Sequence, residues 1–428
     1  MSTTGNRLGI CVALTLLTGC GREPGNESPA GTPAPRGPTF AYVTRSELDL
    51  PTDPNVGAVW KLVLSAYKVD DATGGWSFVG SVPDLVPLTL DARGRFLLAA
   101  FFDRNATHHG TAYQQTQIAT YGMDPSTGAL SLTSTKSAFL MNGPMALHPS
   151  RPFVVSRNSE HCFYRLMAVD PTTGTIGDTL SELSCGGRDE FSSAYSSVAA
   201  DPRGRFLYYS DCGPSGPMLP GQSILPSVSG YRLNTESASM QWTGEWAAGH
   251  CIAIDPSARH LYSSIPDGRL AEFAIDDTTG SLSLMAEAPS LGTPGPLVVH
   301  PSGRFLYLAS GSDIVAYRLD ASVGAPSLVR VVAAGVAEPS FFTGDASHAS
   351  FAFPTCRLAM DPAGRYLYIM RTHVDLYGYA TTDVLGYSMN STTGDLRPIS
   401  QAEGGSLGTV AARPAAHGAW IGLAIAAP

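Results

Sequence analysis

The chain has 428 residues, a formal net charge of −9 and only 15% charged residues, so no strongly basic face points to nucleic acid as a partner. It contains no GxGxxG before a helix, no Walker A, no HExxH and no GxSxG sequence, which excludes the common signatures of nucleotide, zinc-protease and serine-hydrolase sites. Its 45 glycines and 32 prolines favour a turn-rich all-β protein.

Residues 1–20 are predicted to be a lipoprotein signal peptide. Arg7 supplies a positive charge before a 12-residue apolar run, Leu8 to Gly19, which is too short to span a bilayer. The run ends in Leu17-Thr-Gly-Cys20, which resembles a bacterial lipobox and implies that Cys20 carries a lipid. An ordinary secretory signal is the alternative. Gly21 in place of an aspartate favours the outer membrane, so we expect an envelope protein anchored on its periplasmic or surface side.

Residues 21–38 are rich in Pro, Gly and Ser and lack hydrophobic periodicity, which predicts a flexible tether. The folded domain is expected over residues 39–428.

One motif recurs six times in that domain, with starts 45 to 61 residues apart, at Asp91, His148, Asp201, Asp255, His300 and Asp361. Its first half, of the form Asp/His-Pro-x-Gly-Arg, is turn chemistry, because proline presets φ and glycine closes a type I turn. Its second half, such as Phe305-Leu-Tyr307, predicts a strand whose aromatic residues share one face while leucine takes the other. Apolar residues on both faces indicate that each sheet packs between two others.

A second motif alternates with the first and reads apolar-x-Tyr-x-x-Asp-x-Thr-Gly-x-Leu. It occurs seven times, around Tyr67, Tyr121, Ala168, Tyr231, Phe273, Tyr317 and Tyr387, and predicts a hairpin with an Asp/Gly turn. The two motifs together define a four-stranded antiparallel unit with strands A to D. Seven such units predict an all-β fold, a seven-bladed β-propeller.

The first blade begins at strand B (Phe40 to Thr44) and continues through strand C (Val59 to Val69) and strand D (Trp76 to Val79). Its strand A is expected from the C-terminus, Trp420 to Ile425, which would close the ring and cover a sheet edge. The other six A strands are predicted to start near Val86, Pro144, Val198, Ile252, Leu297 and Leu358.

Because the strands alternate in direction, both tight turns should lie on one rim, and the longer B–C and D–A loops on the other. The irregular rim is therefore the candidate functional face. Seven of the ten histidines map to it: His108, His109, His161, His250, His348, His373 and His417. The simpler interpretation is that loops are more polar than strands. No histidine or cysteine spacing matches a known metal-ligand set, and we expect no metal and no cofactor.

Five cysteines map to the same rim, and thiols in an exported chain tend to pair. Neighbouring loops favour Cys162–Cys185 and Cys212–Cys251 and leave Cys356 free, although other pairings remain open.

Units of the form His-Pro-Ser-Gly-Arg-Phe-Leu-Tyr followed by the Asp-x-Thr-Gly hairpin resemble the seven-bladed propeller lactonases, which include bacterial 6-phosphogluconolactonases and fungal carboxymuconate lactonizing enzymes. The resemblance covers about residues 40 to 425 and implies lactone hydrolysis. Members with assigned enzymology carry Gly-Pro-Arg-His at the head of a strand A and Asn-Glu after a strand B. Here Gly143-Pro144 and Gly295-Pro296 continue as Met-Ala and Leu-Val, and no Asn-Glu follows a strand B. The family's catalytic residues are therefore not transferred.

Two functions follow. A lactonase or related esterase needs a base and an oxyanion-stabilising cation. His250 and Arg357, each at the head of a strand A, are the expected pair, with His373 and His417 next. The alternative is a non-catalytic, surface-tethered platform that binds a protein, peptide or glycan at the rim. A quinone-cofactor propeller ranks third, because the five tryptophans do not recur at one blade position. We expect a monomer.

Overall fold

The computed structural model divides the chain into two units, Met1–Arg36 and Gly37–Pro428, and its described residues all lie in the second. They are 38–49, 59–82, 87–93, 96–103, 107–108, 111–112, 115–137, 145–149, 151–158, 163–184, 197–211, 227–249, 251–265, 268–289, 294–310, 313–319, 326–333, 358–374, 379–399, 406–414 and 423–426. These ranges consist of strands and the turns between them.

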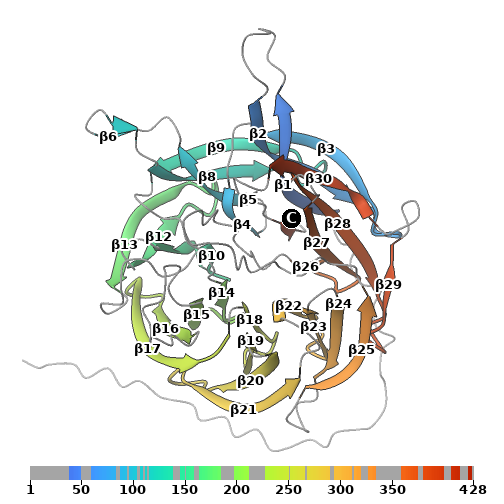
Figure 1. Ribbon diagram of the computed structural model, residues 1–428. Coiled ribbons are helices and arrows are strands. Elements are labelled where there is room, and N and C mark those ends of the chain that lie inside the picture. Colours follow the sequence, from blue (N-terminus) through green and yellow to red (C-terminus); the bar gives the residue numbers. More distant parts are fainter. Residues whose placement is uncertain are drawn as a thin grey trace, which may run out of the picture. The chain divides into compact units, whose positions relative to one another are not determined.

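All but two of the described strands form seven antiparallel sheets, the blades of a β-propeller (Figure 1). Blade 1 contains β31 (Leu423–Ala426), β1 (Thr39–Asp49), β2 (Val59–Val69) and β3 (Trp76–Val82). Blade 2 contains β4 (Pro87–Arg93), β5 (Phe96–Asp103), β8 (Gln115–Met123) and β9 (Leu130–Ser137). Blade 3 contains β10 (Met145–Leu147), β11 (Phe153–Asn158), β12 (Phe163–Val169) and β13 (Ile176–Ser184). Each blade is written here in the order strand A, innermost, to strand D.

The remaining four blades follow the same order. Blade 4 contains β14 (Ser197–Ala200), β15 (Phe206–Asp211), β16 (Ser227–Asn234) and β17 (Ser239–Ala247). Blade 5 contains β18 (Cys251–Ile254), β19 (His260–Ile265), β20 (Arg269–Ile275) and β21 (Leu282–Pro289). Blade 6 contains β22 (Pro294–Val299), β23 (Phe305–Ser310), β24 (Asp313–Arg318) and β25 (Ser327–Ala333). Blade 7 contains β26 (Leu358–Met360), β27 (Tyr366–Val374), β28 (Tyr379–Met389) and β29 (Leu396–Pro398).

The C-terminal strand completes blade 1, as the sequence predicts. β31 pairs antiparallel with β1, with Val43 opposite Leu423 and Phe40 opposite Ala426. The pairing supplies the strand A that blade 1 lacks at its N-terminal end. The two ends of the folded unit are thus held together by backbone hydrogen bonds, which closes the ring and leaves no open edge on β1.

The core consists of seven apolar clusters, and each lies between two successive blades. Phe206 and Tyr208 on β15 belong to the cluster shared with blade 5, whereas Leu207 and Tyr209 belong to the cluster shared with blade 3. This is the alternation predicted from the Phe-Leu-Tyr motif. The cluster that contains Val43 and Tyr368 joins blade 7 to blade 1, so the packing is continuous around the ring.

Both tight turns lie on one rim, where a tyrosine connects each of four blades to the next. Tyr208 Oη donates to the carbonyl oxygen of Gly280 in the Asp-x-Thr-Gly turn of blade 5 at 2.8 Å. Equivalent bonds run from Tyr42 to Gly128, from Tyr307 to Gly394 and from Tyr368 to Gly74. Blade 2 has Leu98 at this position, and Thr120 Oγ1 on the adjacent strand donates to Gly174 instead.

These turn glycines need both a left-handed backbone and empty space. Gly280 has φ of 75°, and a Cβ built on it would lie 2.5 Å from the Phe206 ring of the preceding blade. A phenylalanine therefore packs under a glycine where blade 4 meets blade 5. Only glycine satisfies the two conditions together.

Two histidines of the Asp/His-Pro-x-Gly-Arg turns make a second connection between blades. His148 Nε2 lies 2.8 Å from the carbonyl oxygen of Gly204, and His300 Nε2 lies 2.9 Å from that of Gly364. A carbonyl only accepts, so Nε2 carries the proton, and Nδ1 accepts from the backbone N–H of Arg151 or Ser302. Both imidazoles are therefore neutral parts of the scaffold, and burial lowers the pKa of His300.

Three features depart from the simple repeat. β4 continues through Arg93, which pairs with Phe96, since the first motif copy has Ala92 in place of proline and keeps a backbone N–H for the ladder. β6 (Thr107–His108) and β7 (Thr111–Ala112) form a small hairpin in the B–C connection of blade 2. β30 (Ser406–Pro414) pairs with β28 as an additional strand of blade 7.

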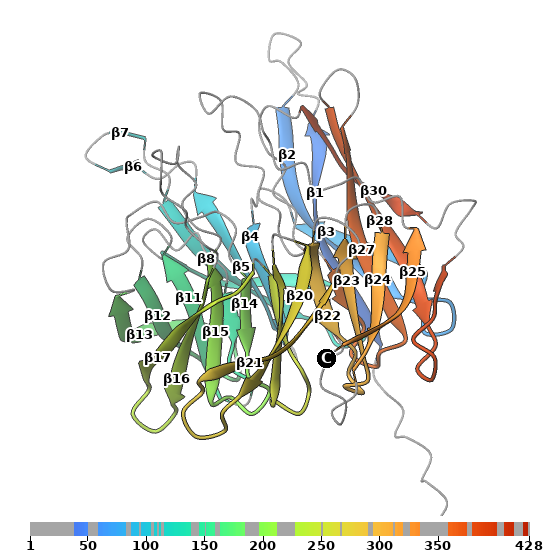
Figure 2. The same ribbon diagram turned by 60° about the horizontal axis from the view of Figure 1, so that its bottom comes forward.

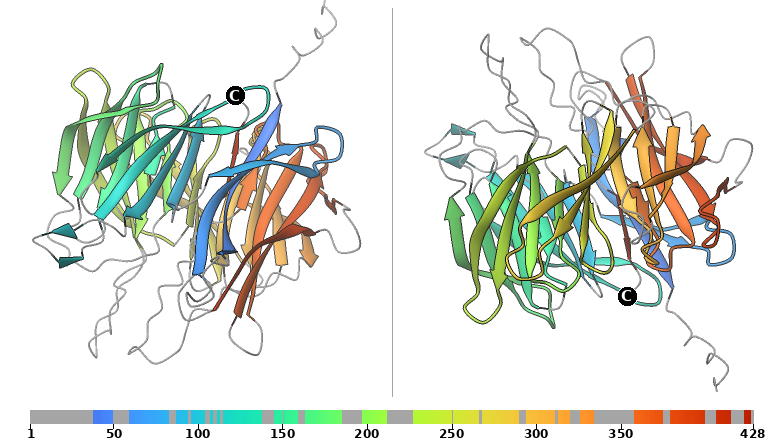
Figure 3. Two further views of the ribbon diagram at one scale, coloured as in Figure 1. Left: turned by 90° about the horizontal axis from the view of Figure 1, so that it is seen from above. Right: turned by 90° about the horizontal axis from the view of Figure 1, so that it is seen from below.

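The additional strand lies where the ring closes. β29 pairs with β28 over Tyr387–Met389, and β30 pairs with it over Tyr379–Leu385, further toward the irregular rim. β1, β2, β28 and β30 extend past the neighbouring strands on that side (Figure 2), and β1 lies beside blade 7 in two further views (Figure 3). The seam between blades 7 and 1 is thus the tallest part of the irregular rim among the described residues.

Candidate functional site

The predicted catalytic residues lie largely outside the described residues. His250, Arg357 and His417 fall in undescribed positions. His373 lies on β27, opposite Thr381 of β28, in the part of blade 7 that extends on the irregular rim. The structure therefore does not test whether these four side chains converge.

The two residues that flank His250 are described, and both are fixed to β19. The Gly249 N–H donates to Ser263 Oγ at 2.7 Å, and the Cys251 N–H donates to Ser264 Oγ at 3.2 Å. Ser263 and Ser264 are fully buried. Because consecutive Cα atoms are about 3.8 Å apart, the backbone on either side of His250 is held at the head of the innermost strand of blade 5.

Gly249 could not be replaced by another residue without moving β19. A Cβ built on it would lie 1.3 Å from the Ser264 carbonyl oxygen, far inside any contact distance. The sequence points to His250 but not to this glycine or the two serines. The Ser263-Ser264 pair at the end of strand B is visible in the sequence. Nothing in its pattern, however, distinguishes these serines from ordinary strand residues.

Cys251 is disulfide-bonded in the structure. Its predicted partner Cys212 lies outside the described residues, as do Cys162, Cys185, Cys356 and the lipid-bearing candidate Cys20. The pairing of Cys251 with Cys212 and that of Cys162 with Cys185 remain predictions. The bond adds a covalent restraint next to His250.

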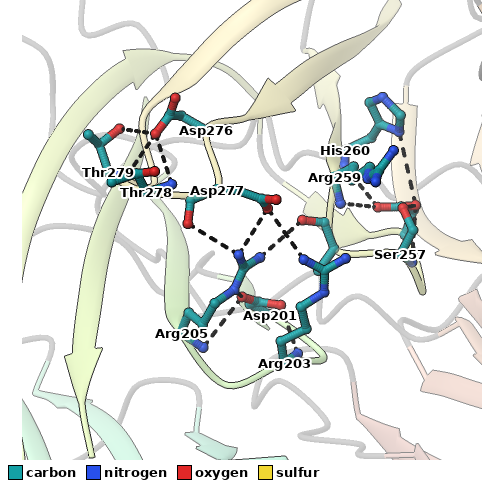
Figure 4. Close-up of polar contacts among 12 residues, drawn as sticks. Asp201, Arg203, Arg205, Ser257, Arg259, His260, Asp276, Asp277, Thr278 and Thr279 are labelled. Carbon is teal, nitrogen blue, oxygen red and sulfur yellow. Dashed lines mark hydrogen bonds and ion pairs between the residues drawn. The ribbon is translucent and has the colours of Figure 1, made fainter. Parts of the chain in front are cut away.

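The opposite rim is crowded with ion pairs between turns, as Figure 4 shows for blades 4 and 5. Arg205 Nε lies 2.8 Å from Asp201 Oδ2 of its own turn, and its Nη1 lies 2.9 Å from Asp277 Oδ1 of the blade 5 hairpin. Arg203 approaches the same Asp277 oxygen at 3.5 Å. The hydrogen bond from Arg205 lowers the pKa of the Asp277 carboxyl.

The same arrangement recurs at the ring closure. Arg365 bonds Asp361 of its own turn at 3.0 Å and Asp71 of blade 1 at 2.7 Å. In the hairpin turns the leading acid binds its own backbone: the Thr279 N–H donates to Asp276 Oδ1 at 2.7 Å and lowers the pKa of that carboxyl. These charges are occupied in holding blades and turns together, which makes this rim the scaffold.

Two features are absent from the described residues. Within the ranges given above, no group of three or more His, Cys, Asp or Glu side chains is placed to hold a metal ion. In the same ranges, no helix is long and apolar enough to cross a bilayer.

A family model matches the chain in part. The model described as "Lactonase, 7-bladed beta-propeller" matches residues 224–355, which include all described strands of blades 5 and 6 and the position of His250. No curated protein matches the chain in sequence.

Solved structures show the same fold. A periplasmic gluconolactonase from Pseudomonas aeruginosa is 16% identical, with 91% of this chain and 100% of that chain covered and a TM-score of 0.60. Candidate 6-phosphogluconolactonases from Bacteroides fragilis (14% identity, 93% and 100% covered, TM-score 0.59) and Bacteroides uniformis (15%, 87% and 98%, 0.58) are similar. At these identities the comparison establishes the fold alone, a seven-bladed β-propeller.

Proposed function

We propose that the chain belongs to the seven-bladed propeller lactonases and hydrolyses a lactone or a related ester at its irregular rim. The observation that carries this proposal is the family match over residues 224–355. The names of the similar structures, a gluconolactonase and candidate 6-phosphogluconolactonases, support a lactone as the substrate class.

The distribution of polar groups supports the choice of rim. On the tight-turn rim, Arg205 of blade 4 and Arg365 of blade 7 each pair with an acid of their own turn and with an acid of the next blade. Turn backbones and buried phenylalanines fill the space between blades there. The sequence assigns the longer connections and most of the histidines to the irregular rim.

The proposed chemistry assigns a role to two residues at the heads of A strands. His250 removes a proton from water, which attacks the lactone carbonyl, and Arg357 stabilises the negative charge that develops on the carbonyl oxygen. The ring C–O bond then breaks, and the leaving oxygen takes a proton to give a hydroxy acid. The Ser263 and Ser264 hydrogen bonds and the Cys251 disulfide support this role by fixing the backbone on both sides of His250.

The test is to assay a protein of residues 21–428 against sugar and aliphatic lactones, with His250→Ala and Arg357→Ala beside it. Loss of an oxyanion partner typically costs on the order of 100-fold in rate. With a histidine base of ordinary pKa, about 6.5, activity should fall as the pH drops through about 6 to 7. Turnover that survives both substitutions rules out this pair while leaving the fold unaffected.

A binding platform is the second candidate, and a specific observation favours it. The Gly-Pro-Arg-His and Asn-Glu sequences of the enzymatically assigned relatives are missing, since Gly143-Pro144 and Gly295-Pro296 continue differently. No turnover of any lactone, together with a captured protein or glycan that requires the irregular loops, would favour this function.

We also propose that the propeller is held at the outer membrane by a lipid on Cys20, through the tether at residues 21–38. The lipobox-like Leu17-Thr-Gly-Cys20 sequence and the composition of the following segment support this placement.

A further inference from the structure

Glu272 occupies a position that other blades fill with small or apolar residues. It stands on β20, opposite Tyr262 of β19 in the sheet register. The corresponding strand C residues of the other blades are Ala66, Thr120, Leu166, Gly230, Ala316 and Gly386. Blade 5 alone places a carboxyl group at this point of the sheet.

The carboxyl group is buried on the side of blade 5 that packs against blade 6. Glu272 is 5% exposed. Leu270, two residues earlier on the same face of β20, and Tyr262 belong to the apolar cluster that blade 5 shares with Leu306 and Leu308 of β23. This set of contacts is called here the blade 5–blade 6 interface.

Among the described residues, the polar groups around Glu272 do not compensate a negative charge. Its hydrogen bond among the described residues comes from Tyr262 Oη, at 3.3 Å. The charged group that acts on it is Asp255, another acid, in the tight turn before β19. A buried ionised carboxyl without a cation is strongly unfavourable, so the protein favours its neutral form.

We propose that Glu272 makes the blade 5–blade 6 interface sensitive to pH. The two blades stay packed together while its carboxyl group is protonated, and they separate more readily when that group ionises. Burial raises the pKa of Glu272 to about 7, with Asp255 adding to the shift and the Tyr262 hydrogen bond opposing it. The closed interface therefore holds a proton that the opened one releases. The contribution of Glu272 to the stability of the closed interface is fully present below about pH 4.5. It is lost as the pH rises to about 7, and stability is constant above that.

This pH dependence of stability is opposite to the one that the buried histidine of blade 6 causes. His300 leads the tight turn of blade 6, and its lowered pKa makes stability fall as the pH drops below about 6.5. The two contributions are separated by comparing wild type with a Glu272 variant rather than by the wild-type profile alone. The comparison does not depend on the proposed lactonase activity.

The experiment is hydrogen exchange by mass spectrometry on residues 21–428 from pH 4.5 to 8, corrected for intrinsic rates, for wild type and Glu272→Gln. Peptides from β20 and β23 should exchange equally in the two proteins near pH 4.5. At pH 8 they should exchange on the order of 100-fold faster in wild type than in Glu272→Gln, since glutamine does not ionise.

The control is Glu287→Gln on β21 of the same blade. Glu287 is paired with Arg269 and is partly exposed, so its replacement should leave the pH profile of β20 as in wild type. Glu272→Thr, which copies Thr120 of blade 2, serves if the glutamine variant does not fold. Equal exchange of wild type and the Glu272 variant across the whole pH range would overturn the proposal.

Discussion

At the residue scale, the turn glycines show how backbone conformation and space act together. Gly303 and Gly364 occupy the same turn position in successive blades and have the same φ of 70°. They differ in what lies beneath them. Among the described residues, a Cβ on Gly303 would have only Pro256 nearby, at 3.8 Å, whereas a Cβ on Gly364 would lie 2.5 Å from the His300 ring. Blade 5 has Ala258 at this position, with φ of 57°, so alanine is tolerated where space permits.

The first prediction uses this matched pair. Gly303→Ala should lower the free energy of unfolding by about 1 kcal/mol, the cost of a left-handed alanine. Gly364→Ala should cost about 1–3 kcal/mol more, because the imidazole must also move. Urea unfolding of the two variants measures the difference. The cost of Gly364→Ala should shrink in a His300→Ala background, and equal costs for Gly303→Ala and Gly364→Ala would show that space is irrelevant.

The second prediction concerns the disulfide of Cys251. Peptide mapping without reduction should find Cys251 joined to Cys212, the neighbouring rim cysteine of blade 4. Cys251→Ser should lower the free energy of unfolding by about 2–4 kcal/mol, and Cys356→Ser, at the cysteine predicted to be free, should leave it unchanged. A Cys251–Cys356 bridge or a free Cys212 thiol would contradict this pairing.

At the element scale, the terminal strand determines whether blade 1 is complete. Deleting residues 418–428 removes β31 and exposes the edge of β1 over Phe40 to Val43. The third prediction is that this truncation aggregates or melts at a much lower temperature. Thermal unfolding followed by circular dichroism, with light scattering, provides the measurement. A soluble truncation with an unchanged melting curve would show that β31 does not close the ring.

The elements predicted correctly are those with local turn chemistry. Strand C of blade 1 was expected over Val59 to Val69 and has those bounds, because hairpin signals flank it. β30 was not predicted, since it belongs to no repeat and gains its hydrogen bonds only from the extended part of β28. The repeat motif predicts a turn from Asp91, whereas β4 extends through Arg93, because no proline follows Asp91 to interrupt the ladder.

The site was less predictable than the fold for a physical reason. Histidines and cysteines can be assigned to a rim from strand direction alone, which is how His250 and Cys251 were selected. The hydrogen bonds of Ser263 and Ser264, and the burial of Glu272 between blades, depend on how neighbouring sheets pack. A glutamate among apolar residues of β20 has the same local pattern whether it faces water or another blade.

At the scale of the whole molecule, the ring explains how function could be confined to one rim. The described tight turns lie on the scaffold rim, where Tyr–Gly and Arg–Asp contacts join blade 4 to blade 5 and blade 7 to blade 1. The other rim is free of this requirement, so its connections can vary in length without opening the ring.

The last prediction concerns where this ring is held. If Cys20 carries a lipid, the wild-type full chain expressed in a bacterium should enter the detergent phase on phase partitioning. Cys20→Ser should move it to the aqueous phase, because the apolar run before Cys20 is too short to span a bilayer. Gly21→Ala, which leaves the cysteine in place, is the matched control and should partition as wild type. A wild-type protein that is already aqueous would mean that the segment acts as an ordinary secretory signal and that Cys20 is unmodified.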